Sequence, residues 1–413
     1  MSNINPTWIK EIIQNDNLLK NKNNLVKKEE IVYIHNLSNQ LEKFDIDNFS
    51  PKVSDKKIKV AFFRDGPFLP ITTGAANSIY GMINALVDQN VEVFLIHSFR
   101  GWSEPDLFKN KKFSSLFVSP EDFYENKEFI KKILKKIKVK ICHFDSAEAV
   151  CLQKKLLPKN RKVVFEVHNV ENELVQQLQL SSVKKIKKIE TKAIKQSDAV
   201  IVRSESNYQS FIKLGCEKNK LFKYRGGINV GDINFKSRSK LHTGKILFLG
   251  HLNYGPNEQA VRIIAKEIAP FINKKFLIAG KGNPLLKLNY SSKNVIFLDW
   301  VSNLNNLFSK IDVALAPIIT GSGTRIKILD YMAAGIPVVG TNMAIEGLEP
   351  EIKNFMIVED DFKKYKQIIE DLYANPKKVK KMSLEARKYV LKNRDWNKCI
   401  KDVIRAYSYV LKK

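Results

Sequence analysis

The sequence predicts an α/β protein made of two halves, each with a parallel sheet covered by helices on both faces. From Lys57 onward, apolar runs of strand length alternate with helical patterns. The alternation starts again after a polar stretch at 236–244, which we expect to be the linker between the two halves. Short, wholly apolar strands separated by helices are typical of parallel strands that are buried on both faces. The length of 413 residues is also enough for two or three domains.

The expected elements of the first half follow one another at regular spacing. Its strands are expected at 58–63, 91–96, 139–144, 163–168 and 199–203. Its helices are expected near 75–89, 122–137, 147–156, 183–196 and 205–214.

The second half repeats the pattern and ends in a helical tail. Its strands are expected at 245–250, 276–280, 295–299, 313–317 and 337–340, and its helices near 257–272, 303–308 and after 324. The tail from Pro376 is expected to be helical and holds Trp396. Two such halves place a ligand cleft between them, at the carboxyl ends of the strands.

Residues 1–56 differ in composition from the rest of the chain. They are polar and rich in Asn and Lys, with a short helical spacing at Trp8, Ile9, Ile12 and Ile13 and no strand pattern. We expect a polar, helical appendage here. The first domain is then 57–236, completed by the C-terminal helix 395–413, and the second domain is 237–394.

The composition bounds the class of protein. No run of about 18 apolar residues occurs, and the N-terminus lacks the apolar core of a signal peptide. The cysteines Cys142, Cys151, Cys216 and Cys399 are scattered without a CxxC pair. This argues for reduced thiols in the cytoplasm and against a disulfide framework or a zinc site.

The net charge of +27 has three possible origins. Lys, Asn and Ile are abundant throughout, as AT-rich codon usage would produce. A surface for anionic membrane is the second origin, and amphipathic helices at 127–138 and 183–195, apolar on one face and lysine-rich on the other, fit it. The same pattern also fits a helix whose apolar face packs in the core and whose lysine-rich face lies in solvent. Nucleic acid is disfavoured, because the basic stretches lack interleaved aromatic residues.

The most informative stretch is GSGTRIKILDYMAAGIPVVG at 321–340. A small, flexible loop precedes a helix whose first turn is expected to carry Arg325 and Lys327; the loop residues are Gly321, Ser322, Gly323 and Thr324. Such a loop brings bare N–H groups close to an anion, and the helix start adds its positive dipole end. Cations at this helix end are disfavoured by the dipole. Two cations placed there nevertheless indicate an anionic partner, such as a phosphate or diphosphate. The alternative is that the loop only caps the helix and that Arg325 and Lys327 are solvated.

Other candidates lie at expected strand ends. His168 follows a buried strand, where an imidazole could donate or accept a proton, or bond to backbone as a structural residue. Gly74, in the first strand-to-helix loop, permits close approach of a substrate or is a plain loop glycine. Gly280 and Lys281 line the cleft or form a tight turn. Asp330 would accept hydrogen bonds from sugar hydroxyls, or is solvated.

Together these residues resemble the GT-B glycosyltransferases of family 4, from about Lys57 to the C-terminus. The strongest match is NVIFLDWVSNLNNLFSKIDVALAPIITGSGTRIKILDYMAAGIPVVGTNMAIEGL, and FLGHLNYGPNEQAV, IAGKGNP, FEVHNVENEL and the late Trp396 fit the same subgroup. The resemblance implies two Rossmann-like α/β domains facing a central cleft, and a retaining, nucleotide-sugar-dependent enzyme.

The resemblance also implies roles for individual residues. His168 would lie near the reacting sugar carbon, Gly74 by the leaving diphosphate, and Asp330 at the nucleotide ribose. The GSGT backbone with Arg325 and Lys327 would hold the donor phosphates and sugar.

The chain departs from the family pattern in two places. In the acidic pair spaced EX7E, the first position is Ser322 and the second is Asp330. The Arg and Lys that many members place after the first strand of the second domain are replaced by GHLNYGPN. We infer that Arg325 and Lys327 supply the missing charge, so that no metal or other cofactor is needed.

The expected function is transfer of a hexose-type sugar from a nucleotide diphosphate sugar to an acceptor hydroxyl, with retention at the anomeric carbon. The acceptor is expected to be a glycan or lipid-linked intermediate of cell-surface polysaccharide or glycolipid synthesis, at the inner face of the membrane. A non-catalytic GT-B protein that binds an anionic glycan or partner is the alternative, and a sugar-nucleotide epimerase is a further one. The sequence does not identify the sugar, the base or the acceptor.

Overall fold

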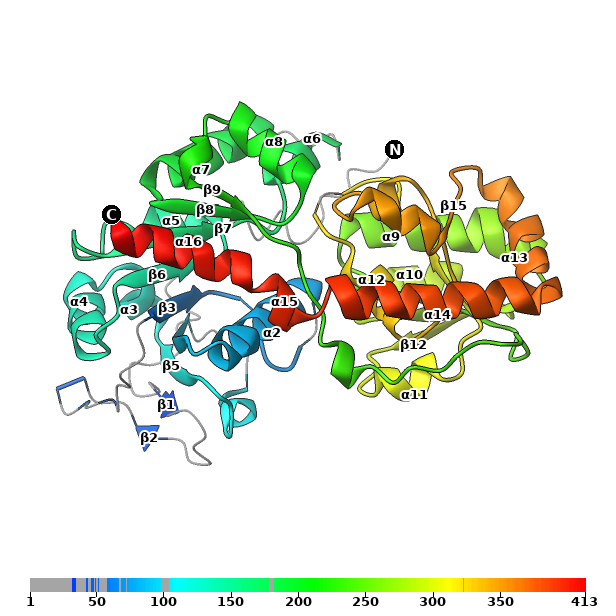
Figure 1. Cartoon of the computed structure of the whole chain (residues 1–413), viewed down its shortest axis with the longest axis horizontal. Coiled ribbons are helices and arrows are strands. Elements are labelled where there is room, and N and C mark those ends of the chain that lie inside the picture. Colours follow the sequence, from blue (N-terminus) through cyan, green and yellow to red (C-terminus); the bar gives the residue numbers. More distant parts are fainter. Residues whose placement is uncertain are drawn as a thin grey trace. The chain divides into compact units, whose positions relative to one another are not determined.

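The computed structural model describes residues 32–34, 42–43, 46–47, 49, 51, 58–66, 68–71, 73–98, 104–177, 182–321 and 323–413. The chain divides into two compact units (Figure 1). One contains Gly226–Asp395, and the other contains the described residues up to Arg225 together with Trp396–Lys413. They are called the C-terminal and N-terminal unit here.

The N-terminal unit is built on a sheet of order β2-β1-β5-β4-β3-β6-β7-β8-β9. Strands β3 to β9 are mutually parallel. The strands are β1 (Val32–Ile34), β2 (Glu42–Lys43), β3 (Lys59–Arg64), β4 (Glu92–Ser98), β5 (Ser114–Val118), β6 (Ile141–Phe144), β7 (Lys162–Glu166), β8 (Ala199–Val202) and β9 (Leu221–Lys223). The strand order reverses at β3 and β6. In open parallel sheets the carboxyl ends at such a switch point border the ligand crevice.

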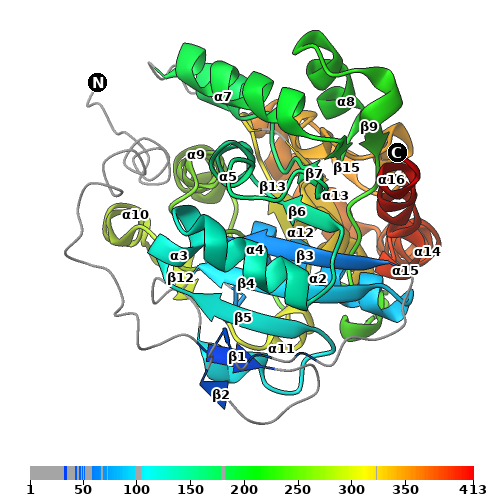
Figure 2. The same ribbon diagram turned by 90° about the vertical axis from the view of Figure 1, so that its left-hand side faces the viewer.

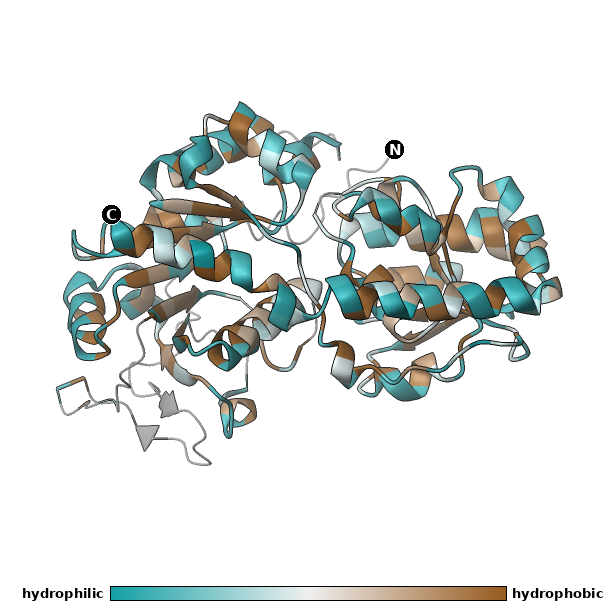
Figure 3. Cartoon of the chain, in the orientation of Figure 1, coloured by the Kyte–Doolittle hydropathy of each residue, from teal (hydrophilic) through white to brown (hydrophobic). Residues whose placement is uncertain are grey.

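Helices cover both faces of this sheet (Figure 2). One face carries α2 (Gly74–Asp88), α15 (Trp396–Cys399) and α16 (Lys401–Lys412). The other face carries α3 (Pro120–Tyr124), α4 (Lys127–Lys136), α5 (Ala147–Gln153), α7 (Val183–Gln196) and α8 (Glu205–Lys213). Helix α6 (Glu171–Gln177) packs on α7, and 3₁₀ turns span Pro105–Phe108 and Lys218–Lys220. The strands are apolar while the outward helix faces are polar, as Figure 3 shows.

Two expectations for this part of the chain were wrong or incomplete, and a third is not tested. The segment before Lys57 was expected to contain no strand, but β1 and β2 form there, and β1 extends the sheet antiparallel to β5. Pairing with a sheet edge satisfies backbone groups that a three-residue strand cannot satisfy alone. The expected helix near 122–137 is the pair α3 and α4, because the Asn126 side chain caps a new start at the Phe129 N–H. The helical pattern at Trp8–Ile13 lies outside the described residues.

The C-terminal unit contains a parallel sheet of order β12-β11-β10-β13-β14-β15. Its strands are β10 (Lys245–Leu249), β11 (Lys275–Ala279), β12 (Val295–Asp299), β13 (Val313–Ala316), β14 (Val338–Gly340) and β15 (Ile357–Val358). Its α-helices are α9 (Gly255–Ile263), α10 (Pro284–Tyr290), α11 (Leu304–Phe308), α12 (Ile326–Ala333), α13 (Tyr365–Ala374) and α14 (Pro376–Asn393). Helix α9 continues as a π-helical turn, Ile264–Ile268, and 3₁₀ turns span Val230–Asp232, Ala269–Phe271, Met343–Ile345, Pro350–Asn354 and Phe362–Lys364. Here the order reverses between β10 and β13.

The segment 236–244, expected as the linker between the halves, lies inside the C-terminal unit. The Arg238 side chain is buried and donates hydrogen bonds to the backbone oxygens of Ala334 and Phe308. These bonds attach the polar stretch to the core of the unit, so the chain crosses between units at Arg225–Gly226 and again at Asp395–Trp396.

No helix in the described part of the chain is long and apolar enough to cross a membrane.

The contact between α2 and Trp396 gives a direct test of the N-terminal unit. A methyl group at Gly81 would lie 2.0 Å from Nε1 of the Trp396 indole. We expect Gly81→Ala to lower stability by about 1–3 kcal/mol, the usual cost of overpacking. Thermal unfolding of the full chain by circular dichroism measures this.

The matched control is Gly74→Ala at the start of the same helix, where an added Cβ meets nothing within 4 Å. That variant should unfold at the wild-type temperature or above it. Combining Gly81→Ala with Trp396→Phe should recover part of the loss. A Gly81→Ala protein that unfolds with the wild type would contradict the packing.

Candidate functional site

The loop 317–325 follows β13, and Gly250 follows β10, so both lie at the switch point of the C-terminal unit. Gly321 and Gly323 have φ angles of +117° and +78°, which only glycine adopts at little cost. A Cβ at Gly347 would lie 2.7 Å from the Gly323 oxygen, and the Thr324 hydroxyl donates to the Gly347 oxygen at 3.3 Å. The loop is therefore held in a defined shape by the turn at Gly347. Ser322 lies outside the described residues.

The sequence suggested that Arg325 lies in the first turn of α12. It is instead the N-cap residue of that helix. Its Nη1 donates to the Gly323 oxygen at 2.6 Å, so the side chain folds back along the loop. Burial lowers the pKa of the guanidinium, and Tyr254 and Glu346 oppose this. A cation that is placed against loop backbone at a helix start is suited to meet an anion there.

Lys327 is the second residue of α12 and points back to the end of β10. Its Nζ donates to Asn257 Oδ1 at 2.7 Å and lies 4.3 Å from the centre of the Phe248 ring. A Cβ at Gly250 would lie 2.9 Å from this Nζ, so the glycine makes room for the ammonium group. Burial, and then the nearby Arg325, lowers the pKa of Lys327 to about 7. The ammonium group of Lys327 thus has a neutral amide, and not a carboxylate, as its hydrogen-bond partner.

Asp330 lies one turn further along α12. Burial raises its pKa to about 7, and its carboxylate makes no hydrogen bond to the described residues. A half-buried carboxylate that lacks a protein donor is suited to accept hydrogen bonds from a ligand. This favours the hydroxyl-binding interpretation over a solvated helix residue.

Gly280 and Lys281 form a tight turn between strand ends. Gly280 has a φ of +144°, and a Cβ there would lie 1.9 Å from the Gly250 oxygen. The Lys281 oxygen accepts from the Leu252 N–H at 2.8 Å, and its side chain is exposed. The close approach that requires Gly280 is thus to protein backbone, which is the alternative interpretation of this motif.

His168 follows β7 in the N-terminal unit and is positioned by the start of α6. The Glu190 carboxylate, from α7, accepts from the N–H groups of Glu171 at 2.8 Å and Asn172 at 3.3 Å. Asn169 donates to Glu171 Oε1 at 3.2 Å, and burial raises the pKa of Glu171 to about 8. The turn after His168 is therefore fixed by side chains of two helices.

Gly74 begins α2, whose N-cap is Thr73. Gly74 is exposed and has open space around it, so its backbone is accessible to a ligand.

The structure also places charged residues that the sequence analysis missed beside His168. Four of them end or follow apolar strands of the N-terminal unit: Arg64, Asp145, Glu166 and Arg203. Arg64 is paired with Asp145, and Arg203 is paired with Glu166. The missed signal was a charged residue at the end of an apolar run, the same feature that identified His168.

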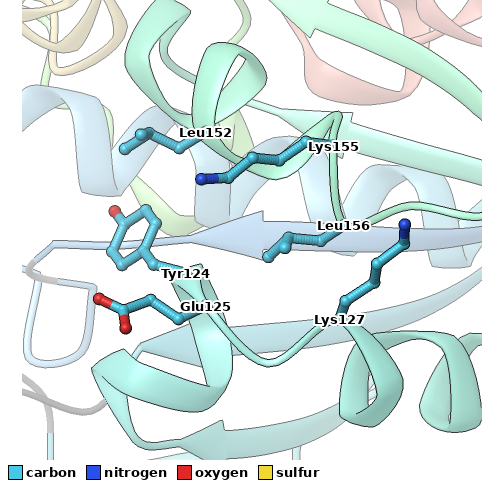
Figure 4. Close-up of a pocket in the computed structure, with 6 residues that line it drawn as sticks. All are labelled: Tyr124, Glu125, Lys127, Leu152, Lys155 and Leu156. Atoms are coloured by element: carbon cyan, nitrogen blue, oxygen red, sulfur yellow. The ribbon is translucent and has the colours of Figure 1, made fainter.

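A surface pocket of about 500 Å³ lies elsewhere on the N-terminal unit, where side chains of α3 and α4 face those around the end of α5 (Figure 4). Its lining residues are Tyr124, Glu125, Lys127, Leu152, Lys155 and Leu156. None of these is a predicted site residue.

Buried Lys327 gives a pH-dependent stability that can be measured. Its pKa in the folded chain is about 7, below that of an exposed lysine, so the unfolded chain holds more protons between about pH 7 and 10. Wild-type stability should therefore gain up to about 1.4 kcal/mol per pH unit from this group as the pH rises through that window. Lys327→Met should lack this gain. Denaturant unfolding at pH 7, 8, 9 and 10 compares the two.

The control is Lys377→Met, an exposed lysine on α14 of the same unit. Its stability should follow the wild-type pH dependence. Parallel pH curves for wild type and Lys327→Met would mean that the ammonium group is not buried.

Two family models match the chain in order. The model described as Glycosyltransferase Family 4 matches residues 72–230, and the model described as Glycosyl transferases group 1 matches residues 243–375. The first match lies in the N-terminal unit except for its last residues, and the second lies in the C-terminal unit with the GSGTR loop. No curated protein matches the chain in sequence.

Solved structures show the same fold over most of the chain. Sucrose-phosphate synthase from Thermosynechococcus elongatus is 14% identical, with a TM-score of 0.70 over 86% of this chain and 100% of its own. A glycosyltransferase from Rickettsia africae is 16% identical, with a TM-score of 0.64 over 86% and 99%. Anabaena HepE in complex with UDP and glucose is 11% identical, with a TM-score of 0.66 over 85% and 100%. With both units matched in chain order, the protein belongs to the group 1, family 4 glycosyltransferases and has the GT-B fold.

Proposed function

We propose that this glycosyltransferase moves a hexose-type sugar from a nucleotide diphosphate sugar to an acceptor hydroxyl, with retention at the anomeric carbon. The observation that carries the donor class is the pair of half-buried cations, Arg325 and Lys327, beside the glycine loop at the β10–β13 switch point. A diphosphate would accept charge-assisted hydrogen bonds from both cations.

The groups of α12 suit different parts of such a donor. Arg325 and Lys327 would bind the two phosphates, together with N–H groups of the loop at 321–324. Asp330 would accept hydrogen bonds from the ribose hydroxyls, because its carboxylate has no donor among the described residues. Uridine nucleotides are the first to test, since HepE was solved in complex with UDP-glucose.

In the reaction, a bond forms between the acceptor oxygen and the anomeric carbon while the bond from that carbon to the diphosphate oxygen breaks. Negative charge grows on the departing diphosphate, and one of its oxygens takes the proton that the acceptor hydroxyl releases. Arg325 and Lys327 would stabilise that charge without a metal ion or another cofactor. In the N-terminal unit, His168 would contact the reacting sugar, and Gly74 would let the diphosphate approach the start of α2.

We propose a glycan or lipid-linked acceptor in the synthesis of cell-surface polysaccharide or glycolipid. TarM of S. aureus, a relative in fold at 10% identity, was solved with alpha-GlcNAc-glycerol and UDP. The non-catalytic alternative is disfavoured by the family matches over both units.

The donor proposal predicts a loss of binding in Arg325→Ala and Lys327→Ala. Each removes a charge-assisted contact worth roughly 1.5–3 kcal/mol, so the Kd for the donor should rise about ten- to a hundredfold. A panel of UDP-glucose, UDP-N-acetylglucosamine and GDP-mannose is first screened for thermal stabilisation of the wild type. Nucleotide release from the best ligand is then followed in EDTA, and it should persist there.

The control is Lys377→Ala, which removes an exposed cation from the same unit. It should bind the donor like the wild type. Unchanged donor affinity in both α12 variants would assign the cations to a structural role. Loss of release in EDTA, restored by Mg²⁺ or Mn²⁺, would overturn metal independence.

We also propose that an anionic membrane surface, at the cytoplasmic face, is a partner of the N-terminal unit. Helices α4 and α7 lie on the same face of its sheet, with their apolar stripes in one core. Lysines are exposed on the outer sides of both; they are Lys127, Lys132, Lys135, Lys184, Lys185, Lys187, Lys188, Lys192 and Lys195. Lys127 and Lys155 border the pocket of Figure 4 on this same face. The apolar stripes are core, so attraction would come from charge alone.

This proposal predicts salt-sensitive binding to vesicles. Each well-placed lysine contributes about 1 kcal/mol near an anionic surface. Reversing two of them, in Lys184→Glu/Lys188→Glu, should weaken co-sedimentation with phosphatidylserine-containing vesicles at least about tenfold. The wild type should also detach at high salt, because exposed charges are screened within about 8 Å at physiological ionic strength.

The control reverses the same amount of charge in the other unit, as Lys377→Glu/Lys380→Glu on α14. It should bind vesicles nearly as well as the wild type. Equal binding of both double variants, or equal binding of the wild type to neutral vesicles, would leave the net charge without a membrane role.

A further inference from the structure

A buried set of hydrogen bonds converges on Glu166 at the carboxyl end of β7. Its Oε1 accepts from Arg203 at Nε, 3.0 Å away, and at Nη2, 2.5 Å away, and also from the Tyr224 hydroxyl. Its Oε2 lies 3.2 Å from His143 Nε2, and His143 Nδ1 lies 2.8 Å from the Tyr407 hydroxyl of α16. Glu166 is completely buried, so these contacts replace water around its charge.

The same guanidinium reaches His168. Arg203 Nη2 lies 3.5 Å from His168 Nε2. Arginine has only donors, so the imidazole nitrogen that faces it must accept and carries no proton. A neutral imidazole holds one proton, which places that proton on Nδ1 of His168.

The Nδ1 atom of His168 is shielded from solvent and has no hydrogen-bond partner among the described residues. Buried donors without a hydrogen bond are rare, because leaving such a donor unsatisfied costs about 1–3 kcal/mol. Its partner is therefore expected from outside the protein, as an oxygen of a bound molecule.

Charged and titratable groups surround His168 from each neighbouring strand: Arg64 of β3, His143 of β6, Glu166 of β7 and Arg203 after β8. Burial lowers the pKa of His168 well below its usual value, and Arg203 and Arg64 lower it further, while Glu166 opposes them. Burial opposes ionisation of Glu166, but Arg203 holds the pKa of that carboxyl well below its usual range. Arg203 therefore stays beside an ionised partner while His168 stays neutral.

We propose that Arg203, anchored by Glu166, is a positioning residue that fixes His168 as the neutral Nδ1–H form, which donates a hydrogen bond to an oxygen of the bound sugar. The identity of that ligand rests on the proposed function, but the state of the imidazole does not. His168 then acts as a fixed donor and does not exchange a proton during turnover.

The first test measures the free protein and needs no substrate. The full chain is labelled with ¹⁵N-histidine, and ring nitrogen shifts are recorded from pH 5.5 to 8.5, with the His168 signal assigned by its loss in His168→Gln. We expect a protonated Nδ1 and an unprotonated Nε2 throughout. Exposed His242 gives the comparison signal. A protonated Nε2 or a charged ring at pH 7 would overturn the proposal.

The second test uses paired variants. The Asn amide reaches about as far as imidazole Nδ1, and the Gln amide about as far as Nε2. His168→Asn should therefore keep at least ten times more kcat than His168→Gln, with similar donor KM in both. Equal losses of kcat would overturn the assignment of the donor to Nδ1.

Arg203→Met should free the ring, so that His168 titrates within the range recorded and kcat falls about tenfold or more. Arg203→Lys keeps the charge and should keep the Nδ1–H form. A folded Arg203→Met protein with unchanged ring shifts would overturn the positioning role. If Arg203→Met does not fold, the wild-type shifts and the His168 pair still decide. Failure of the donor-binding test with the expected ring shifts would refute the proposed function alone.

Discussion

Both units are organised by one constraint: a parallel sheet that is covered on both faces has nowhere to place charged groups except at its strand ends. In the N-terminal unit the strands are buried by α2, α15 and α16 on one face and by α3 to α8 on the other. Charged side chains consequently appear as soon as each strand stops, as at Arg64, Asp145 and Arg203. In the C-terminal unit the same rule places the loop with Arg325 at the end of β13.

The charged side chains of the two sites differ in the partners that the protein gives them. In the N-terminal unit, Glu166 and Arg203 neutralise each other within the protein, and the pair is complete without a ligand. In the C-terminal unit, Lys327 has a neutral amide as its hydrogen-bond partner, and no described residue donates a hydrogen bond to Asp330. The first arrangement is suited to hold a neighbouring group in one state, whereas the second is suited to a ligand that supplies the hydrogen-bond partners. This difference distinguishes the proposed positioning network from the proposed binding site.

Family membership and local geometry answer different questions. The matched models and the GT-B fold establish a glycosyltransferase, and they say nothing about the state of an individual imidazole. The arrangement around His168 is decided by atoms of β7, of the loop after β8 and of α16. These segments are far apart in the chain. They meet because β6, β7 and β8 are hydrogen-bonded neighbours in the sheet.

Local patterns in the sequence determined most of the elements and several site residues. The alternation of apolar runs predicted the strands from β3 onward except β5 and the short β9 and β15, and the spacing around GSGTR predicted a helix that carries Lys327 and Asp330. These features depend on neighbours within a few residues, so a single sequence contains them. His168 was recognisable for the same reason, because it directly follows an apolar strand.

Only the tertiary structure decided which charges meet. The expected linker at 236–244 is held in the C-terminal unit by Arg238, whose partners Phe308 and Ala334 lie far along the chain. Gly280 is required because the backbone of Gly250 leaves no room for a Cβ. Strand β1 forms by pairing with the edge strand β5. Likewise, Arg203 reaches Glu166 and His168 only through the pairing of β7 with β8. The strength and direction of such contacts depend on distance in space, which residue spacing along the chain does not contain.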